Sequence, residues 1–283
     1  MATYGSFSHA IPTLMSRLIK NHQVIKPFTW QSMDVSQRKE ATLLERWGDS
    51  FEVVCLSDEL QHYRDDIHPN LPWADNHFER DRVCGLPVNP GFTWQDWPWS
   101  NRANTFRTHG AQFDHSYAER FWPKYAGKTV DGAGGDELII GGVETLTPNR
   151  GPRFPYGDLR DVVNLIDRDP TTRQAVLPIF FPEDTGATQG QRVPCSLFYH
   201  FYHHDGRLHM RYDIRSCDAL RHFRDDIYLA VRLQLWVIKS LRLASPDRWK
   251  DLRMGRFTMN IGSFHCFIND VDHIKAAILE YPR

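Results

Sequence analysis

The sequence lacks the cysteine patterns of disulfide-rich and zinc-binding proteins. It contains no Cys-x-x-Cys pair and no small disulfide-scaffold spacing. Its odd set of five cysteines consists of Cys55, Cys84, Cys195, Cys217 and Cys266. A reducing compartment fits such usage best.

An excess of charge of either sign is also missing. The 34 basic residues are matched by 35 acidic ones, which leaves a formal net charge of −1. No global basic field therefore argues for nucleic acid as a partner. A small anionic ligand would require only a local cluster of arginines.

Long apolar runs and targeting segments are absent as well. The most apolar segment, Ile227 to Leu243, is interrupted by Arg232, Gln234 and Lys239, so it is too polar to span a bilayer. The N-terminal stretch MATYGSFSHAIPTLMSRLIK lacks the basic and long apolar regions of a signal peptide. We expect a cytoplasmic protein with no membrane partner.

Two further binding patterns are incomplete. The glycine-rich segment GAGGDELIIGG, residues 132–142, lacks the Lys-Ser/Thr ending of a P-loop and the spacing of a dinucleotide fingerprint. We interpret it as a flexible loop. The chain has no His-Glu-x-x-His motif, and strand alternation would scatter the histidines between His200 and His209 over both faces. We predict no metal site.

Hydrophobic periodicity predicts an α+β protein. Helical patterns cover residues 11–19, 117–125 up to a stop at Pro123, 158–167, 226–243 and 271–279. Strand patterns cover residues 52–56, 175–181, 195–203, 208–214 and 257–267. Their order is too irregular for a doubly wound sheet. We expect a single domain spanning 1–283, with 1–110 its least informative part and a Pro- and Trp-rich loop packed onto the core over 68–99.

Cys195 is the candidate nucleophile. It follows Pro194, lies near Arg192 in sequence, and is expected near Arg215 across a hairpin that turns at Asp205-Gly206. Nearby cations lower the pKa of a thiol and increase its thiolate fraction, as a nucleophile requires. Single cysteines are most often inert packing residues, and this alternative stays open.

The order of four segments resembles the thymidylate synthase superfamily. RVPCSLFYHF, YDIRSCD, FRDD and NIGSFHCF follow one another as a Pro-Cys nucleophile, an Arg-Ser-x-Asp segment and a Gly-x-x-His strand do there. The resemblance covers about residues 173–270. It implies a thymidylate synthase-like fold, a mixed sheet packed with helices, with one sheet face at a homodimer interface. It also implies that the Cys195 thiolate adds to C6 of a pyrimidine nucleotide, whose C5 then takes a one-carbon unit from 5,10-methylenetetrahydrofolate.

Within that superfamily the details resemble the pyrimidine nucleotide hydroxymethylases. Arg224-Asp225-Asp226 stands where the synthase has Pro-Phe-Asn and the phage deoxycytidylate hydroxymethylase has Arg-Asn-Asp. An amide matches the N3–H and C4 carbonyl of uracil, whereas a carboxylate accepts from the cytosine amino group and from a protonated N3. Asp226 therefore favours cytosine, with a solvated helix N-terminal carboxylate as the alternative. No match to the apolar C-terminal segment of the synthase follows the last helix, and a wetter site would suit capture by water.

The resemblance also implies an acid/base and a folate contact. Glu119 in ERFW matches the family's Glu-x-x-Trp segment and is the candidate acid/base, with Trp122 beside the cofactor. An exposed helix glutamate is the alternative, and Glu59 is the competitor. Asp218 matches the aspartate that contacts the pterin.

Phosphate and sugar contacts follow in the same way. Arg215 and Ser216 match the family's phosphate-binding Arg-Ser, and Arg173 matches an arginine that reaches in from the other subunit. Gln174 replaces the second arginine of that pair. Forked guanidinium groups suit a phosphate dianion, and either Arg82 or Arg80 is the candidate for a further, mobile arginine.

The sugar site leaves the nucleotide open. His265 is retained, but Phe267 stands where the synthase has a tyrosine that bonds the sugar, so both CMP and dCMP remain possible. We predict 5-hydroxymethylation of one of them, in nucleotide or nucleoside-antibiotic biosynthesis. The alternatives are methylation or hydroxymethylation of dUMP, a non-catalytic pyrimidine nucleotide-binding module, and a cysteine hydrolase.

Overall fold

The computed structural model describes residues 1–30, 33–54, 56–100, 107–109, 112–124, 139–140, 143–144, 156–186 and 192–282. Its centre is a seven-stranded sheet with the strand order β1-β5-β13-β12-β11-β10, in which β2 also pairs with β5. The bounds are β1 Ala2–Tyr4, β2 Gln23–Ile25, β5 Leu43–Val53, β10 Val176–Pro178, β11 Ser196–His204, β12 Arg207–Asp218 and β13 Arg253–Phe267. Three of these strands come from residues 1–110 and join the same sheet as the C-terminal ones.

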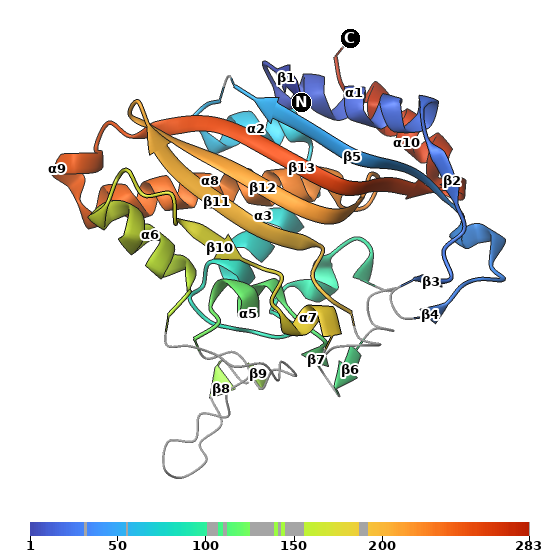
Figure 1. Ribbon diagram of the computed structural model, residues 1–283, viewed down its shortest axis with the longest axis horizontal. Helices are drawn as coiled ribbons and strands as arrows, with labels where there is room; N and C mark the ends of the chain where they lie inside the picture. Colours follow the sequence, from blue (N-terminus) through green and yellow to red (C-terminus); the bar gives the residue numbers. More distant parts are fainter. Residues whose placement is uncertain are drawn as a thin grey trace.

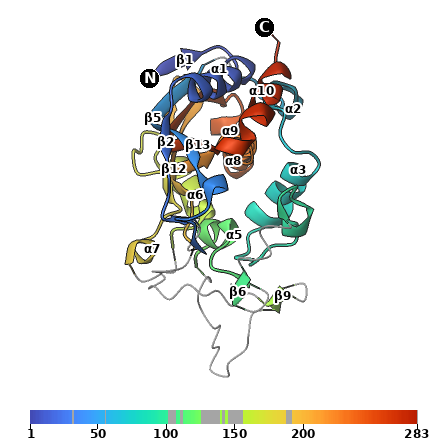
Figure 2. The same cartoon turned by 90° about the vertical axis from the view of Figure 1, so that its right-hand side faces the viewer.

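Helices cover one face of this sheet, as Figures 1 and 2 show. The long helix α8 (Phe223–Ala244) packs on β12 and β13, and α1 (Phe7–Lys20) packs on β5. The other described helices are α2 Leu60–Ile67, α3 Trp73–His77, α5 Tyr117–Phe121, α6 Leu159–Arg168, α7 Glu183–Gly186, α9 Pro246–Trp249 and α10 Val271–Leu279. The short 3-10 segments are η1 Lys39–Ala41, η3 Trp94–Asp96 and η5 Ile268–Asp270, and η2 Phe78–Arg82 is a π-helical turn.

Local sequence explains the two strands that carry most of the site. The β11–β12 hairpin turns at Asp205 and Gly206, whose φ angles of 50° and 66° suit the tight turn of a right-twisted hairpin. Along β12, Leu208, Met210 and Tyr212 alternate with polar residues and are buried under α8. β12 and β13 run parallel, which requires the crossover that α8 provides.

Three small hairpins lie outside the main sheet. They are β3 (Thr29–Trp30) with β4 (Met33–Asp34), β6 (Arg107–His109) with β7 (Gln112–Phe113), and β8 (Ile139–Ile140) with β9 (Val143–Glu144). The segment 132–142, predicted to be a flexible loop, lies outside the described residues except for β8. None of the described helices is long and apolar enough to cross a membrane.

The predicted α+β class is confirmed, with differences at particular elements. The strand predicted at 52–56 is the end of the longer β5, and Cys55 is not among the described residues. The helix predicted over 117–125 ends at Phe121, before the turn that contains Pro123. The segment 68–99 also contains α3 and η2, which its proline and tryptophan content concealed.

Candidate active site

A cavity of about 680 Å³ lies between one end of the sheet and the segments around α3 and α5. Strands β12 and β13, with the residue just before β11, contribute what we call the sheet wall: Cys195, Arg215, Ser216, Asp218, Ser263 and His265. The facing segments contribute what we call the loop wall: Trp73, His77, Arg82, Val88, Trp97 and Tyr117. Asp226, in the first turn of α8, also lines the cavity. Its size is in the range of small-molecule sites.

Strand register brings the sheet wall together. The backbone N–H of Arg215 donates to the carbonyl oxygen of Cys195 at 2.9 Å. In the β12–β13 ladder, Ser216 is opposite Ser263 and Asp218 is opposite His265. Residues far apart in sequence therefore share one end of the sheet.

A glycine permits the close approach of two of these strands. A Cβ atom built on Gly262 would lie 2.6 Å from the carbonyl oxygen of Arg215, closer than real Cβ contacts. Any side chain there would push β13 away from β12 beside the cavity. The glycine in NIGSFH is thus required by the backbone that carries Arg215.

Cys195 is half-buried and lies beside cationic groups. The Nη2 atom of Arg215 is 4.0 Å from its sulfur, and the same guanidinium group donates to the carbonyl oxygens of Pro194 at 2.9 Å and Val193 at 3.1 Å. Burial raises the pKa of the Cys195 thiol; Arg215 opposes this shift, and the negative charge of Asp226 adds to it. The ionisation of the thiol therefore depends on whether Asp226 is charged.

Asp226 and its neighbour Asp225 occupy different environments. Asp225 is buried, and both its oxygens accept hydrogen bonds from Asn70, from the backbone N–H at 2.9 Å and from the side-chain amide at 2.7 Å. The Asp226 carboxylate is half-buried, and its Oδ2 atom is 3.6 Å from the Cys217 sulfur. Burial raises the pKa of Asp226 to about 7, although Arg82 favours its charged form. Both residues line the cavity, but the Asp225 carboxylate is tied to Asn70 at the start of α8, whereas that of Asp226 has no such backbone or amide donor among the described residues.

Asp218 is held in its charged form. Its carboxylate accepts from the side chain of Arg221 at 2.8 Å and from the backbone N–H groups of Leu220 and Arg221, both at 2.9 Å. Burial is the largest single influence and disfavours the charge, but Arg221, His222 and His265 together outweigh it, so the pKa of Asp218 lies below its ordinary value. Next to it, His222 stacks on Trp97 with ring centroids 5.0 Å apart.

The loop wall presents hydroxyl groups and a cation to the same space. The hydroxyl groups of Tyr117 and Ser196 are 3.0 Å apart, and that of Ser196 is 2.7 Å from the hydroxyl of Tyr212. The Arg82 guanidinium carbon lies 4.3 Å from the centre of the Tyr117 ring. Arg82 also donates from Nε to Nε2 of His77 at 3.2 Å. These contacts begin at Ser196, the residue that follows the predicted nucleophile Cys195.

Seven of the predicted site residues line the cavity together: Cys195, Asp226, Arg215, Ser216, Asp218, His265 and Arg82. Arg80 and Glu59, the competitors weighed above, are exposed and do not line it. Arg173 is exposed between α6 and β10, outside the cavity of its own chain. Its predicted contact with a neighbouring subunit stays a prediction.

Glu119 and Trp122 are not in the cavity wall. Glu119 is fully buried, and its carboxylate accepts from the backbone N–H of Ser116 at 2.6 Å and from the Asn89 amide at 2.9 Å. Trp122 is buried and donates its indole N–H to the carbonyl oxygen of Arg82 at 2.9 Å. The structure therefore places both behind the loop wall, where they hold Ser116 and Arg82.

Sequence reasoning missed Tyr117, Cys217 and Glu45 as cavity or neighbouring residues. Tyr117 stands two residues before Glu119 in the segment that was singled out, so its position carried a signal. Glu45 accepts a hydrogen bond from Ser263 across the β5–β13 ladder. No local motif marks it, because only the pairing of distant strands brings it to the cavity.

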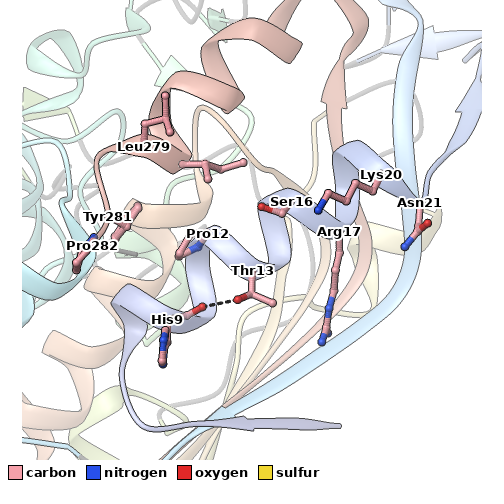
Figure 3. A pocket seen from close by; sticks show the side chains of 11 residues that line it. His9, Pro12, Thr13, Ser16, Arg17, Lys20, Asn21, Leu279, Tyr281 and Pro282 are labelled. Carbon is pink, nitrogen blue, oxygen red and sulfur yellow. Dashed lines mark hydrogen bonds between the residues drawn. The ribbon is translucent and has the colours of Figure 1, made fainter.

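A second, smaller hollow of about 390 Å³ lies between α1 and α10 (Figure 3). His9, Thr13 and Arg17 border it on α1, and the Thr13 hydroxyl donates to the carbonyl oxygen of His9 at 2.7 Å. None of the predicted site residues lines it. Among the residues with described positions, no group of three or more His, Cys, Asp or Glu side chains could hold a metal ion.

The fold and the cavity define an α+β protein in which a thiol, arginines and carboxylates surround a small-molecule site. A family model described as thymidylate synthase matches residues 91–283, more than half of the chain. The chain belongs to the thymidylate synthase family. The match extends upstream of the segment 173–270 that carries the resemblance and includes Trp97 and Tyr117 of the loop wall.

The fold agrees with this assignment. The structure is similar to that of the thermostable thymidylate synthase A from Bacillus subtilis, with a TM-score of 0.60 and 13% sequence identity. The alignment covers 97% of this chain and 84% of that chain. The thymidylate synthase-like fold is confirmed, and family membership supports one-carbon transfer of the thymidylate synthase type, for which that family uses methylenetetrahydrofolate.

Proposed function

We propose that the protein 5-hydroxymethylates a cytidine monophosphate, CMP or dCMP, using 5,10-methylenetetrahydrofolate and water. The observation that carries this proposal is that Cys195 and Asp226 line the same cavity. A thiol that adds to C6 and a carboxylate that binds the amino side of the same ring must face one small space. Cys195, just before β11, and Asp226, in the first turn of α8, meet that requirement.

The sheet wall supplies the nucleophile. Addition of the Cys195 sulfur to C6 makes C5 nucleophilic, and Arg215, 4.0 Å from the sulfur, stabilises the thiolate form. Because the charge of Asp226 raises the pKa of the thiol, protonation of Asp226 favours the thiolate. At the moment of attack, negative charge therefore moves from the Cys195 sulfur to the Asp226 carboxylate.

Asp226 supplies the base recognition. Its ionised carboxylate accepts from the cytosine amino group and from a protonated N3, whereas it has no donor for the C4 carbonyl of uracil. Among the described residues, the carboxylate of Asp226 accepts a hydrogen bond from the thiol of Cys217, at its Oδ2 atom. Its Oδ1 atom accepts none from those residues. That free oxygen is the one we assign to the ring.

The aromatic side of the cavity fits a folate. Trp73, Trp94, Trp97 and Trp99 line it, and flat rings stack favourably on such side chains. Asp218 is charged and buried, and it lies near His222, which stacks on Trp97. Its carboxylate is a suitable acceptor for pterin N–H groups. When bound, methylenetetrahydrofolate supplies the one-carbon unit; this chain's residues orient it and leave room for the water that adds afterwards.

We further propose a homodimer through the helix-free face of the sheet. Along that face the ladder places Val176, His200, Arg211, Thr258 and Glu52 in one row. Within the described residues, the buried Nε2 atom of His200 has no hydrogen-bond partner, as expected if a second chain supplies one. Arg173, exposed beside β10, would then reach the neighbouring phosphate site.

Tritium release from C5 tests the function directly. CMP, dCMP and dUMP, each labelled at C5, are incubated with the protein with and without methylenetetrahydrofolate. We expect release from a cytidine nucleotide in the presence of the folate, with a hydroxymethylated product and no dihydrofolate. Formation of dihydrofolate from dUMP would identify methylation instead, and binding of CMP without release would identify a non-catalytic module.

The same assay tests the dimer. Inactive Cys195→Ala protein is mixed with inactive Arg173→Ala protein under conditions that exchange subunits. A shared site predicts recovered tritium release, because one hybrid site has both an intact thiol and an intact arginine. No recovery, with exchange demonstrated by mass, would place Arg173 outside the site.

A further inference from the structure

The thiol of Cys217 contacts the proposed base-reading acid from inside the protein. Cys217 lies on β12, is 1% exposed, and is not part of the cavity wall. Its Sγ atom is 3.6 Å from Oδ2 of Asp226 and 4.0 Å from the carbonyl oxygen of Asp218, so the carboxylate is the nearer of the two acceptors of this thiol. A buried thiol aimed at one oxygen of a carboxylate makes the two oxygens of that carboxylate unequal.

We propose that Cys217 is a specificity-determining positioning residue: by donating to Oδ2 of Asp226, it reserves Oδ1 for the proton that the carboxyl group exchanges with the pyrimidine. This inference rests on the proposed function, because it concerns how Asp226 reads a cytosine. A thiol has a single hydrogen to donate. While that hydrogen is on Oδ2, a proton arriving on the acid is better placed on Oδ1, the oxygen assigned above to the pyrimidine ring.

The placement of this proton matters for the chemistry. When the Cys195 thiolate adds to C6, an S–C6 bond forms and the C5=C6 electron pair moves to C4=C5. The former C4=N3 pair then becomes the bond from N3 to the proton, which leaves Oδ1 of Asp226. Asp226 becomes a carboxylate paired with the N3–H and the amino group. Atoms and charge balance without any further reactant.

Uracil is disfavoured by the same geometry. It presents an N3–H donor beside the C4 carbonyl, so it needs an acceptor and a donor side by side. With Oδ2 bonded to the thiol, Oδ1 is the oxygen that we assign to the ring, and one oxygen cannot be protonated and bare at once. An asparagine at this position would present both groups, which is why the thiol acts on specificity only in combination with an acid.

The surroundings of Asp226 allow it to carry a proton near neutral pH. Burial raises its pKa to about 7, Arg82 opposes this shift, and the negative charges of Asp225 and Asp218 add to it. The thiol hydrogen bond favours the charged form. The other titratable groups whose charges couple to it are the thiol of Cys195 and the hydroxyls of Tyr117, Tyr199 and Tyr212.

Two variants at position 217 separate this role from packing. Cys217→Ala removes the donor, and Cys217→Ser restores one. The first measurement is the titration of the Asp226 carboxyl carbon, followed by nuclear magnetic resonance in the ligand-free protein. We expect Cys217→Ala to raise the midpoint by roughly half a pH unit to one unit, the worth of an ordinary hydrogen bond, since a thiol is a weak donor, and Cys217→Ser to return it toward wild type.

The second measurement is tritium release from the labelled cytidine nucleotide, compared with release from labelled dUMP. Cys217→Ala should lower the cytosine preference several-fold, and Cys217→Ser should recover it. A packing role predicts the reverse order, because serine is the more polar replacement at a buried position. The matched control is Cys266→Ser, at a buried cysteine of β13 that has no contact with Asp226, and it should leave the midpoint unchanged.

The results distinguish this inference from the proposed function. If wild-type protein releases no tritium from CMP or dCMP, the proposed function fails, whatever the titration shows, and the specificity role fails with it. If wild type releases tritium but the Cys217→Ala midpoint and preference equal those of wild type, the function stands and the role of Cys217 is wrong. A Cys217→Ser protein no closer to wild type than Cys217→Ala would also overturn it.

Discussion

The two walls of the cavity are built in different ways. The sheet wall is positioned by backbone ladders, so that Ser216 lies opposite Ser263 and Asp218 opposite His265 by register alone. The loop wall is positioned by side chains: Trp73 donates to the carbonyl oxygen of Thr93 at 3.1 Å, and the Asn89 side chain exchanges two hydrogen bonds with Phe113, both 2.9 Å long. A backbone ladder tolerates substitution of its exposed side chains, whereas each side-chain contact of the loop wall can be changed separately.

This difference suggests a division of roles. In the proposed function, the sheet wall supplies the groups for covalent attack and anion binding, and the loop wall with the start of α8 supplies the groups that distinguish one pyrimidine from another. Asp226 marks the boundary, because its backbone belongs to a regular helix while Arg82 of the loop wall affects its charge. Variants in each wall should therefore fail in different ways.

The largest effect is expected at the thiol of the sheet wall. Cys195→Ala should reduce tritium release by about a thousandfold or more, since removal of a nucleophile eliminates the covalent route. Nucleotide binding, measured by calorimetry, should persist. The matched control is Cys84→Ala, at a half-buried cysteine outside the cavity, which should retain activity. Substantial release by Cys195→Ala would remove the assignment.

The next largest effect is expected at the boundary between the walls. Asp226→Asn should shift the ratio of cytosine to uracil nucleotide turnover by roughly 10- to 100-fold toward uracil, the worth of one hydrogen bond to a charged group. Asp272→Asn is the control, because that carboxylate is exposed on α10 and lies outside the cavity wall. It should leave the ratio alone. An unchanged ratio in Asp226→Asn contradicts the base-reading role.

The contrast also explains what the sequence could predict. Cys195, Arg215, Asp218 and His265 lie within short strand motifs, and a strand fixes which residues neighbour one another once its partners are known. The α+β class and the long α8 followed from periodicity in the same way. These predictions required only local pattern and the order of motifs.

The loop wall could not be derived in this way. Tyr117 reaches Ser196 across 79 positions in sequence, and no pattern in either segment specifies that contact. For Glu119, by contrast, the sequence does contain a pattern that predicts its position. Ser116 and Glu119 have the Ser-x-x-Glu spacing of a capping box, in which the glutamate turns back to the helix start. The family resemblance of ERFW predicts an acid/base, a role that stays a prediction, while the Ser-x-x-Glu spacing that includes Ser116 indicates a cap.

A moderate effect is expected from the loop wall's hydroxyl group. Tyr117→Phe removes the contact with Ser196 and keeps the ring under Arg82. The loss of one hydrogen bond should lower tritium release by about 5- to 10-fold. Tyr156→Phe, at an exposed tyrosine outside the cavity wall, is the control. If the rate falls equally in both variants, Tyr117 does not act through its hydroxyl group.

The smallest effect on activity is expected behind the loop wall, at Glu119. A general acid or base in contact with the substrate contributes about 10²- to 10⁴-fold, so Glu119→Gln would lose that much if the role implied by the family resemblance holds here. The geometry favours a smaller change, because both carboxylate oxygens are engaged by Ser116 and Asn89. We expect release within about threefold of wild type and a loss of about 1 kcal/mol in the free energy of unfolding, as for other lost helix caps. Denaturant unfolding and the tritium assay on the same preparation distinguish a helix-capping role from a catalytic one. A large loss of rate at unchanged stability would show that Glu119 acts in catalysis and not as a cap.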